Sequence, residues 1–269
     1  MTTYQQVLRL TPAMSFSWRR AQHVIEHNVM NYRRNWFYLV SGFFEPLFYL
    51  LGIGLGLGRL VGSLSVDGHP VSYATFVAPG LLAAAAMNGA MWDATFNFFF
   101  KLKVEKTFET MLATPLSVLD VACGELGWTL IRGAIYSSGF LVVMSIFGYC
   151  QSPLAILCLP AAGLISLAFG ACGLAATSFM RSWQDLGTVS LAMLPMFLFS
   201  GTFYGLTFYP GWLQAIIRLT PLYQGVALLR DLDVGVLTPV MWVHVGYLCL
   251  LTLIGFIVVS HRLVRLLTP

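Results

Sequence analysis

Charge is scarce in this sequence. Only 10% of its 269 residues are Asp, Glu, Lys or Arg, whereas soluble domains have about 25%. Hydrophobic residues make up 58%, and the mean hydropathy is +0.77. A soluble protein of this length needs many more charges on its surface, so the composition indicates an all-α protein that crosses a membrane several times. The net charge of +4 does not indicate a nucleic-acid-binding protein, because the basic residues cluster at the ends of apolar segments.

The sequence also lacks a nucleotide-binding motif. No GxxxxGK[ST] pattern occurs, and the glycine-rich run LGIGLGLG at 51–58 has no Lys-Ser or Lys-Thr pair after it. Its glycines lie at the end of an apolar segment, where small residues let a neighbouring helix approach closely. We therefore expect no ATP hydrolysis by this chain through that motif.

Catalytic and metal-binding patterns are missing as well. The five cysteines include no CxxC pair, and we expect them to be small buried hydrophobic residues. His23 and His27 are spaced i, i+4, but no third ligand accompanies them. We expect no enzyme activity from this chain alone and no cofactor or metal bound to it. The first apolar run begins near Trp36, too late for a cleavable signal peptide.

Six apolar segments have the length of about 20 residues that an α-helix needs to cross a bilayer. They cover about 36–58, 76–100, 126–147, 153–179, 187–207 and 240–260. Pro195, Gly201 and Gly205 interrupt the fifth segment. We therefore predict an N-terminal segment over 1–35, a six-span transmembrane domain over 36–260 and a tail over 261–269.

The basic residues predict the orientation. Eleven Lys and Arg lie in the N-terminal segment, the loops after spans two and four, and the tail, against three on the opposite side. We therefore expect a multi-pass protein of the cytoplasmic (inner) cell membrane with both termini in the cytoplasm. Apolar residues between 18 and 36 recur every three or four positions among arginines. This pattern predicts either an amphipathic helix on the lipid headgroups or a basic anchor that only fixes topology.

Further irregularities fall between spans five and six. Prolines at 210 and 221 break an otherwise helical stretch and suit the first turn of a helix. We predict two short helices there, at about 211–219 and 222–232, in or along the outer membrane face.

Charged residues inside the predicted spans cost about 2.5–3.5 kcal/mol each at the centre of a helix. The polar residues in question are Glu45, Asn88, Asp93, Glu125 and Arg132. They could line a translocation path, or Arg132 could neutralise Asp93 or Glu125 between packed helices. Glu45 has no basic residue on its own span, which favours a path or a dimer seam.

Several motifs resemble those of ABC-2-type transporter permeases. ETMLATPL at 109–116 resembles the family signature, a glutamate followed by a Leu-x-x-Thr/Ser-Pro-Leu/Ile turn. Five further segments resemble the branch of the family that includes the NodJ lipo-oligosaccharide exporters. They are PLFYLLGIGLGLG (46–58), YATFVAPG (73–80), LDVACGEL (119–126), LFSGTFY (198–204) and PLYQGVALLR (221–230). The resemblance covers about residues 20–262. Daunorubicin-type drug exporters share the layout, so the cargo stays open.

The resemblance implies a half-transporter. Two six-span permease subunits, identical or paired with a related chain, would dock on two separate ATPase subunits that bind ATP and Mg²⁺. In such permeases the loop between spans two and three is a coupling helix that seats in a cleft of the ATPase. This implies a helix of about three turns at about 103–115, with Glu105 and Glu109 on one face, whereas the alternative is a solvated loop that only keeps topology. The implied ATPase contacts are Glu105, Phe108, Glu109, Met111, Leu112, Thr114 and Pro115, with Phe108, Met111 and Leu112 as an apolar anchor, and a smaller contact at Arg181 and Asp185.

The predicted function is ATP-driven export of an amphipathic lipid-like, lipo-oligosaccharide or hydrophobic drug-like molecule. Aromatic residues that could line an apolar path, or else face lipid, include Trp92, Phe96, Phe197, Phe199 and Phe203. One alternative is a non-transporting assembly or regulatory subunit of a membrane complex. Another is a proton-coupled transporter that uses Glu45 or Asp93, which would need an internal repeat that the sequence does not contain.

Overall fold

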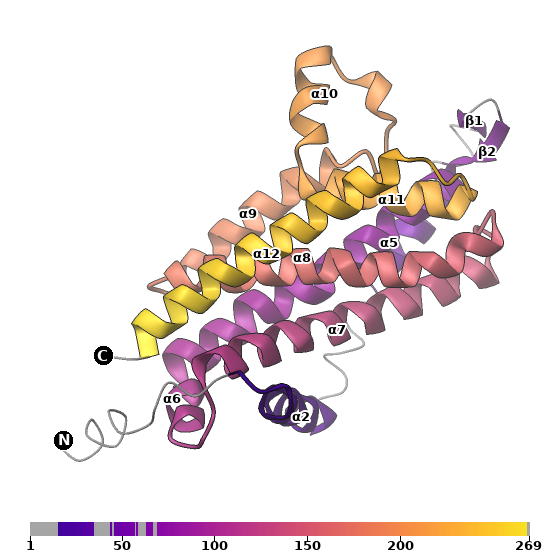
Figure 1. Cartoon of the computed structure of the whole chain (residues 1–269). Helices are drawn as coiled ribbons and strands as arrows, with labels where there is room; N and C mark the ends of the chain where they lie inside the picture. The colour runs from indigo at the N-terminus through magenta and orange to yellow at the C-terminus, as the bar shows by residue number, and fades with distance from the viewer. Residues whose placement is uncertain are drawn as a thin grey trace.

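The structure is a computed structural model that describes residues 16–34, 44, 46–56, 58, 63–66 and 69–267. The described residues are helical apart from one β-hairpin and short connections (Figure 1). Strands β1 (Ser63–Val66) and β2 (His69–Ser72) pair antiparallel, with Ser63 opposite Ser72.

The helical elements comprise α-helices of different lengths and short π- or 3₁₀-helical turns. In chain order they are α2 (Trp18–Arg34), the π-helix η1 (Leu50–Leu55), α5 (Tyr73–Trp92), the π-helical turns η2 (Asp93–Asn97) and η3 (Phe100–Val104), α6 (Thr107–Leu112), α7 (Val118–Ile146), the 3₁₀ turn η4 (Pro153–Leu157), α8 (Cys158–Phe179), α9 (Asp185–Leu198), the 3₁₀ turn η5 (Leu206–Phe208), α10 (Gly211–Arg218), α11 (Pro221–Val234) and α12 (Val240–Leu267).

Four helical segments are long and apolar enough to cross a membrane: Tyr73–Val104, Val118–Ile146, Pro153–Phe179 and Val240–Leu267. They coincide with the second, third, fourth and sixth predicted spans. The fifth is shorter than predicted, because α9 has 14 residues and ends at Leu198, just before a turn in which Gly201 has a φ of 76°. Of the first predicted span, positions 36–43, 45 and 57 lie outside the described residues.

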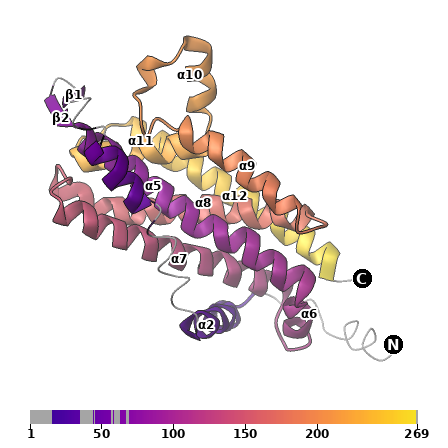
Figure 2. The same ribbon diagram turned by 180° about the vertical axis from the view of Figure 1, so that it is seen from behind.

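The long helices run side by side (Figures 1 and 2), and α5 packs against α7, α8, α11 and η1. The apolar part of the segment that α5 forms with its π-turns is 89% buried, against 28% for α12. Its small residues explain this position, because α5 contains the run AAAAMNGA at 83–90. Small side chains let neighbouring helix backbones approach on every side.

Two glycines show how closely the helices pack. A Cβ atom on Gly133 of α7 would lie 1.9 Å from the Ser166 hydroxyl of α8. One on Gly255 of α12 would lie 2.7 Å from the backbone of Ala171 on α8. Small residues thus set the spacing of α8 from two of its neighbours.

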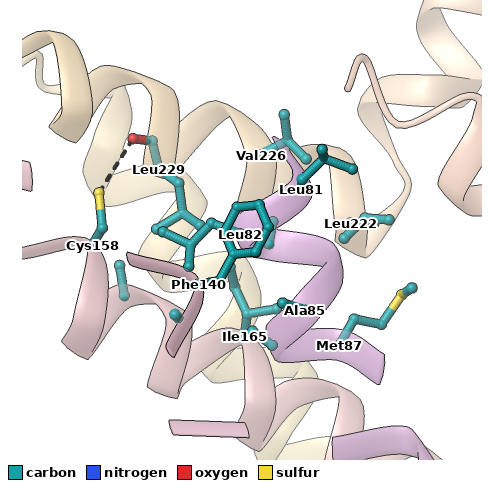
Figure 3. Packing of buried hydrophobic residues seen from close by; sticks show 14 of the residues in the cluster. Leu81, Leu82, Ala85, Met87, Phe140, Cys158, Ile165, Leu222, Val226 and Leu229 are labelled. Carbon is teal, nitrogen blue, oxygen red and sulfur yellow. Dashed lines mark hydrogen bonds between the residues drawn. The ribbon is translucent and has the colours of Figure 1, made fainter. Parts of the chain in front are cut away.

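The largest apolar cluster lies where α5 meets α7, α8 and α11 (Figure 3). Its members in the close view are Leu81, Leu82, Ala85, Met87, Phe140, Cys158, Ile165, Leu222, Val226 and Leu229. Cys158 is fully buried there, and its thiol donates a hydrogen bond of 3.5 Å to the Leu229 carbonyl. The prediction of buried cysteines holds for Cys158 and is wrong for Cys249, which is exposed, while the other three are half-buried.

The two ends of the bundle differ in what they carry. At one end η3 leads into α6, and α2 crosses α7 nearby (Figure 1). At the other end lie the β-hairpin, α11 and α10, and α10 stands away from the long helices. We call these the α6 end and the α10 end. The helices predicted before the first span and between spans five and six are present as α2, α10 and α11.

Candidate functional site: the α6 end and its buried charges

The helix at the α6 end is shorter than the resemblance implies. α6 spans Thr107–Leu112, and Lys106 before it has a φ of 54°. This left-handed residue separates α6 from η3, so Glu105 lies outside the helix. The prediction that Glu105 and Glu109 share one helix face is therefore wrong. At the far end of α6 the Thr114 hydroxyl donates to the Met111 carbonyl, and Pro115 follows.

The apolar side of α6 faces the protein itself. Phe108 is fully buried, and its ring centroid lies 5.2 Å from that of Phe98. Met111 and Leu112 are half-buried against the same cluster. The interpretation of Phe108 as an apolar anchor for a partner is therefore wrong, because Phe108 fixes α6 to its own bundle.

The polar side of α6 is exposed. Glu109 lies 3.6 Å from the ammonium of Lys106, and their side chains are 50% and 64% exposed. Thr110, Thr114 and Pro115 are also exposed. An exposed ion pair contributes little to stability, so this surface can change partners at small cost.

A buried ion pair joins η3, the turn that precedes α6, to α7. The Lys101 ammonium lies 2.8 Å from the Glu125 carboxylate, and their side chains are only 8% and 2% exposed. Asn28 of α2 joins both, since its carbonyl oxygen accepts from Lys101 at 2.7 Å and its amide donates to Glu125 at 3.1 Å. The predicted second span ended at position 100, which put Lys101 in the following loop; this is wrong, because Lys101 is buried in the helical turn η3. Three segments, α2, η3 and α7, meet in this contact.

A second buried group lies one to two turns deeper. Arg132 of α7 lies 2.9 Å from Asp93, and both side chains are 2% exposed. The Tyr32 hydroxyl donates to Asp93 and accepts from Arg132, each at 2.7 Å. Asn97 donates to Asp93 and to Tyr32, while Tyr136 accepts from Arg132 at 3.0 Å. Of the two partners considered for Arg132, the structure selects Asp93.

The π-turn η2 brings Asp93 and Asn97 together. The Phe98 amide donates to the Asp93 carbonyl five residues earlier, which is the hydrogen bond of a π-helix. Such wide turns inside α-helices are frequent at functional sites. Here the turn places two polar side chains of the second span on the side that faces Tyr32 and Arg132.

A third contact holds the start of α2. Arg20 lies 2.6 Å from Asp120, which is fully buried. The same carboxylate accepts from the backbone amides of Ser17 and Ser117 at 2.8 and 2.9 Å. An amphipathic helix on the lipid headgroups would point its arginines toward lipid, whereas Arg20 faces the protein.

Tyr32 is suited to its bridging position by its surroundings. Its ring stacks on Trp128 at 5.2 Å between centroids. Burial, followed by the negative charge of Asp93, raises the pKa of Tyr32 well above its usual value. The hydroxyl therefore keeps its proton and remains a hydrogen-bond donor.

The remaining predicted residues lie apart from these contacts. The Asp185 carboxylate accepts from the backbone amides of Arg181 and Ser182 at 2.8 and 3.1 Å, so it caps the turn before α9. Asn88 is half-buried on α5 and belongs to neither buried group among the described residues. Glu45 lies outside the described residues.

At the α10 end lies an aromatic pocket with a volume of about 370 Å³ that is partly open to its surroundings. It is lined by Tyr49, Tyr73, Phe197, Leu198, Phe199, Phe203, Tyr204 and Tyr209. The Tyr73 hydroxyl donates to the Phe203 carbonyl at 3.2 Å and fixes one wall. Of the aromatic residues that the sequence suggested for an apolar path, Phe197, Phe199 and Phe203 line this pocket. Trp92 and Phe96 do not line this pocket, and they stack on each other at 4.6 Å.

Sequence reasoning missed the members of the buried groups that come from α2. Asn28 and Tyr32 are spaced i, i+4, so two polar groups interrupt the face of α2 that also carries Ala21 and Val24. Polar residues on an otherwise apolar face indicate buried polar contacts, and this pattern could have identified both residues. Lys101 gave no such signal, because lysine at the end of a span is ordinary.

Comparison with known proteins adds family relationships. Residues 20–233 match the family described as ABC-2 type transporter. Nodulation protein J of Rhizobium leguminosarum bv. trifolii is 33% identical over 224 residues, which cover 82% of this chain and 83% of that protein. Nodulation protein J of Rhizobium meliloti (strain 1021) is 30% identical over 226 residues, 84% of this chain and 85% of that one. The inner membrane transport permease YadH of Escherichia coli (strain K12) is 23% identical over 216 residues, 78% of this chain and 80% of that one.

Proposed function

This chain belongs to the ABC-2 type transporter family, and on that basis we propose that it is the permease subunit of an ATP-driven exporter. The observation that carries the proposal is the construction of α6. One side of this short helix is fixed to the bundle by the buried Phe108 ring, and the other side presents Glu109 to the surroundings. A motor protein can push on such a helix without unfolding it.

The buried ion pair of Lys101 and Glu125 can transmit a force on α6 into the membrane domain. A displacement of α6 acts first on η3, which carries Lys101. The contacts of Lys101 with Glu125 and Asn28 pass it on to α7 and α2. Because each contact is short and buried, the three segments move as a unit.

The partners follow from the same proposal. The ATPase would be a separate subunit that binds ATP and Mg²⁺, since this sequence contains no GxxxxGK[ST] motif. The α6 end would face the cytoplasm, as the excess of Lys and Arg in its loops supports. Two permease subunits, identical or related, would form the complete membrane domain, with the smaller ATPase contact near Arg181 and Asp185.

The proposed cargo is an amphipathic molecule with a large hydrophobic part, lipid-like or drug-like. The aromatic pocket supports this class, because its lining residues carry no charge. Relatives bear the names nodulation protein J and inner membrane transport permease, and the second name supports transport as the activity.

The test is co-purification and ATP hydrolysis with the cognate ATPase, comparing wild type with Glu109→Ala. The matched control is Glu26→Ala, because Glu26 is a comparably exposed glutamate on α2. We expect the wild type and Glu26→Ala to bind the ATPase equally. Glu109→Ala should lose about tenfold in affinity, which corresponds to about 1.4 kcal/mol.

The possible results separate two parts of the proposal. If no ATPase subunit co-purifies with the wild type, the permease assignment to an ATP-driven exporter is wrong. If the ATPase binds but Glu109→Ala behaves as Glu26→Ala does, the complex stands and Glu109 is not part of the contact.

A further inference from the structure

We propose that the aromatic pocket at the α10 end holds a hydrocarbon chain, either of a bilayer lipid or of an acylated cargo. The cargo half of this statement rests on the proposed export function. The lipid half does not, because it depends only on the pocket and on the membrane around it.

The chemistry of the lining favours an apolar ligand. Seven of the eight lining residues are aromatic, the eighth is Leu198, and none is charged. An ion buried here would lose its water without an opposite charge in return. The hydroxyl of Tyr73 is already bonded to the Phe203 carbonyl, so the wall that it forms presents mainly carbon atoms.

The pocket has room for an acyl chain. It is partly open to its surroundings and has a volume of about 370 Å³, so a chain can enter it from outside. Water gains little there, because it needs two to four polar partners, whereas an acyl chain supplies dispersion contacts to the lining. In a membrane the abundant apolar groups are acyl chains.

The arrangement of the rings favours a chain over a flat aromatic ligand. Phe197 and Phe203 meet at an interplanar angle of 78°, and Phe199 and Tyr209 at 61°. A planar ligand stacks best on ring faces that lie parallel to it. Rings inclined to each other leave an uneven wall, to which a flexible chain adapts.

The rim provides a place for a polar headgroup. Tyr204 lines the pocket and is 55% exposed, and tyrosine is enriched where hydrocarbon meets water. A chain with its end among Phe197 and Phe203 would thus leave its polar part near Tyr204.

The test uses the full chain in vesicles of phosphatidylcholine that carries a photoreactive diazirine at the end of one acyl chain. After illumination, mass spectrometry maps the labelled positions. Leu198→Trp should fill the pocket and lower labelling between Tyr204 and Tyr209 by about tenfold, the factor for a loss of about 1.4 kcal/mol. The matched control is Leu191→Trp, the same substitution on α9 at a residue that is 72% exposed and does not line the pocket.

A second filling variant, Phe199→Trp, covers the case in which Leu198→Trp fails to fold. An alkyl glycoside with the same diazirine chain distinguishes the two sources. Labelling by the phospholipid alone assigns the pocket to bilayer lipid, and labelling by both probes extends it to an acylated cargo.

Absence of labelling at the pocket in the wild type, or equal labelling in the filled variants, overturns the proposal. Because the vesicles contain no ATPase, failure of the exporter assignment does not affect this readout.

Discussion

The two ends of the bundle are held together by different chemistry. At the α6 end three buried carboxylates, of Asp93, Asp120 and Glu125, each have a cationic partner from another segment. At the α10 end the buried contacts are between apolar side chains, and they include the rings of Phe197 and Phe203 at 5.2 Å between centroids. One cation there, Arg230, lies 4.1 Å from the Phe76 ring centroid and donates to the Gly201 carbonyl at 2.9 Å, and no carboxylate lies within 4.0 Å of it among the described residues.

This difference gives the two ends of the bundle different mechanical properties. Charge-assisted hydrogen bonds are directional, so they keep α2, η3 and α7 in one relative position. Contacts between aromatic rings are less directional and tolerate several packings. The α6 end is therefore suited to transmit a displacement, and the α10 end is suited to accept groups of different shape.

The largest effect is expected where a charge at the α6 end loses its partner. Lys101→Met leaves the buried Glu125 carboxylate with Asn28 alone, which should cost about 3–5 kcal/mol of stability. The apparent melting temperature of the protein in detergent should fall accordingly. We expect most of the variant to aggregate during size-exclusion chromatography.

The matched control removes both charges. Lys101→Met combined with Glu125→Leu should recover most of the lost stability, because no uncompensated ion then remains buried. If the double variant is as unstable as the single one, the contact is not an ion pair whose members depend on each other.

A pH dependence is expected from one carboxylate at the α10 end. Asp233 is fully buried on α11, and burial raises its pKa from 3.8 to about 6, against a smaller opposite effect of Gln151. Because the folded state favours the protonated acid, Asp233 lowers stability as the pH rises from about 4 to above 6. The loss amounts to about 3 kcal/mol for a shift of this size.

Thermal unfolding of Asp233→Asn and of wild type at pH 5 and pH 8 measures this loss of stability. The stability of the variant minus that of wild type should be larger at pH 8 than at pH 5. A difference between the two proteins that does not change with pH would contradict the assignment, and it would give the α10 end the same kind of paired carboxylate as the α6 end.

A smaller effect is expected from the hydroxyl that bridges the deeper charged group. Tyr32→Phe keeps the ring stacked on Trp128 but removes the contacts to Asp93 and Arg132, at a cost of about 1.5–3 kcal/mol. Tyr204→Phe is the matched control at the α10 end, because Tyr204 is 55% exposed. Melting temperatures should fall in the first variant and stay within error in the second. Equal losses in both would mean that hydroxyl bonds matter no more at the α6 end than at the α10 end.

Much of the architecture could be predicted from the sequence, because hydropathy directly reports burial in lipid. Four spans, the helix α2 and the short helices α10 and α11 are found where apolar runs, arginine spacing and prolines predicted them. The pairing of Arg132 with Asp93 was one of two choices, and the sequence contained no way to decide between them.

The partners of Lys101 and Phe108 could not be predicted, because they depend on helix rotation. The π-turns η2 and η3 change which side of the second span each residue faces. The left-handed conformation of Lys106 then turns α6 so that Phe108 points inward. No residue type in this stretch demands a π-turn or a left-handed lysine, so these rotations come from tertiary packing.

The enclosed position of α5 has a consequence for biosynthesis. Ribosomes make the chain from its N-terminus, so the second span is synthesised before α7, α8 and α11. At that moment Asp93 and Lys101 lack Arg132 and Glu125, which come later in the chain. The charges of the second span therefore stay unmatched until the third span is made. The stable insertion of the second span thus depends on the span that follows it, which supplies Glu125 and Arg132.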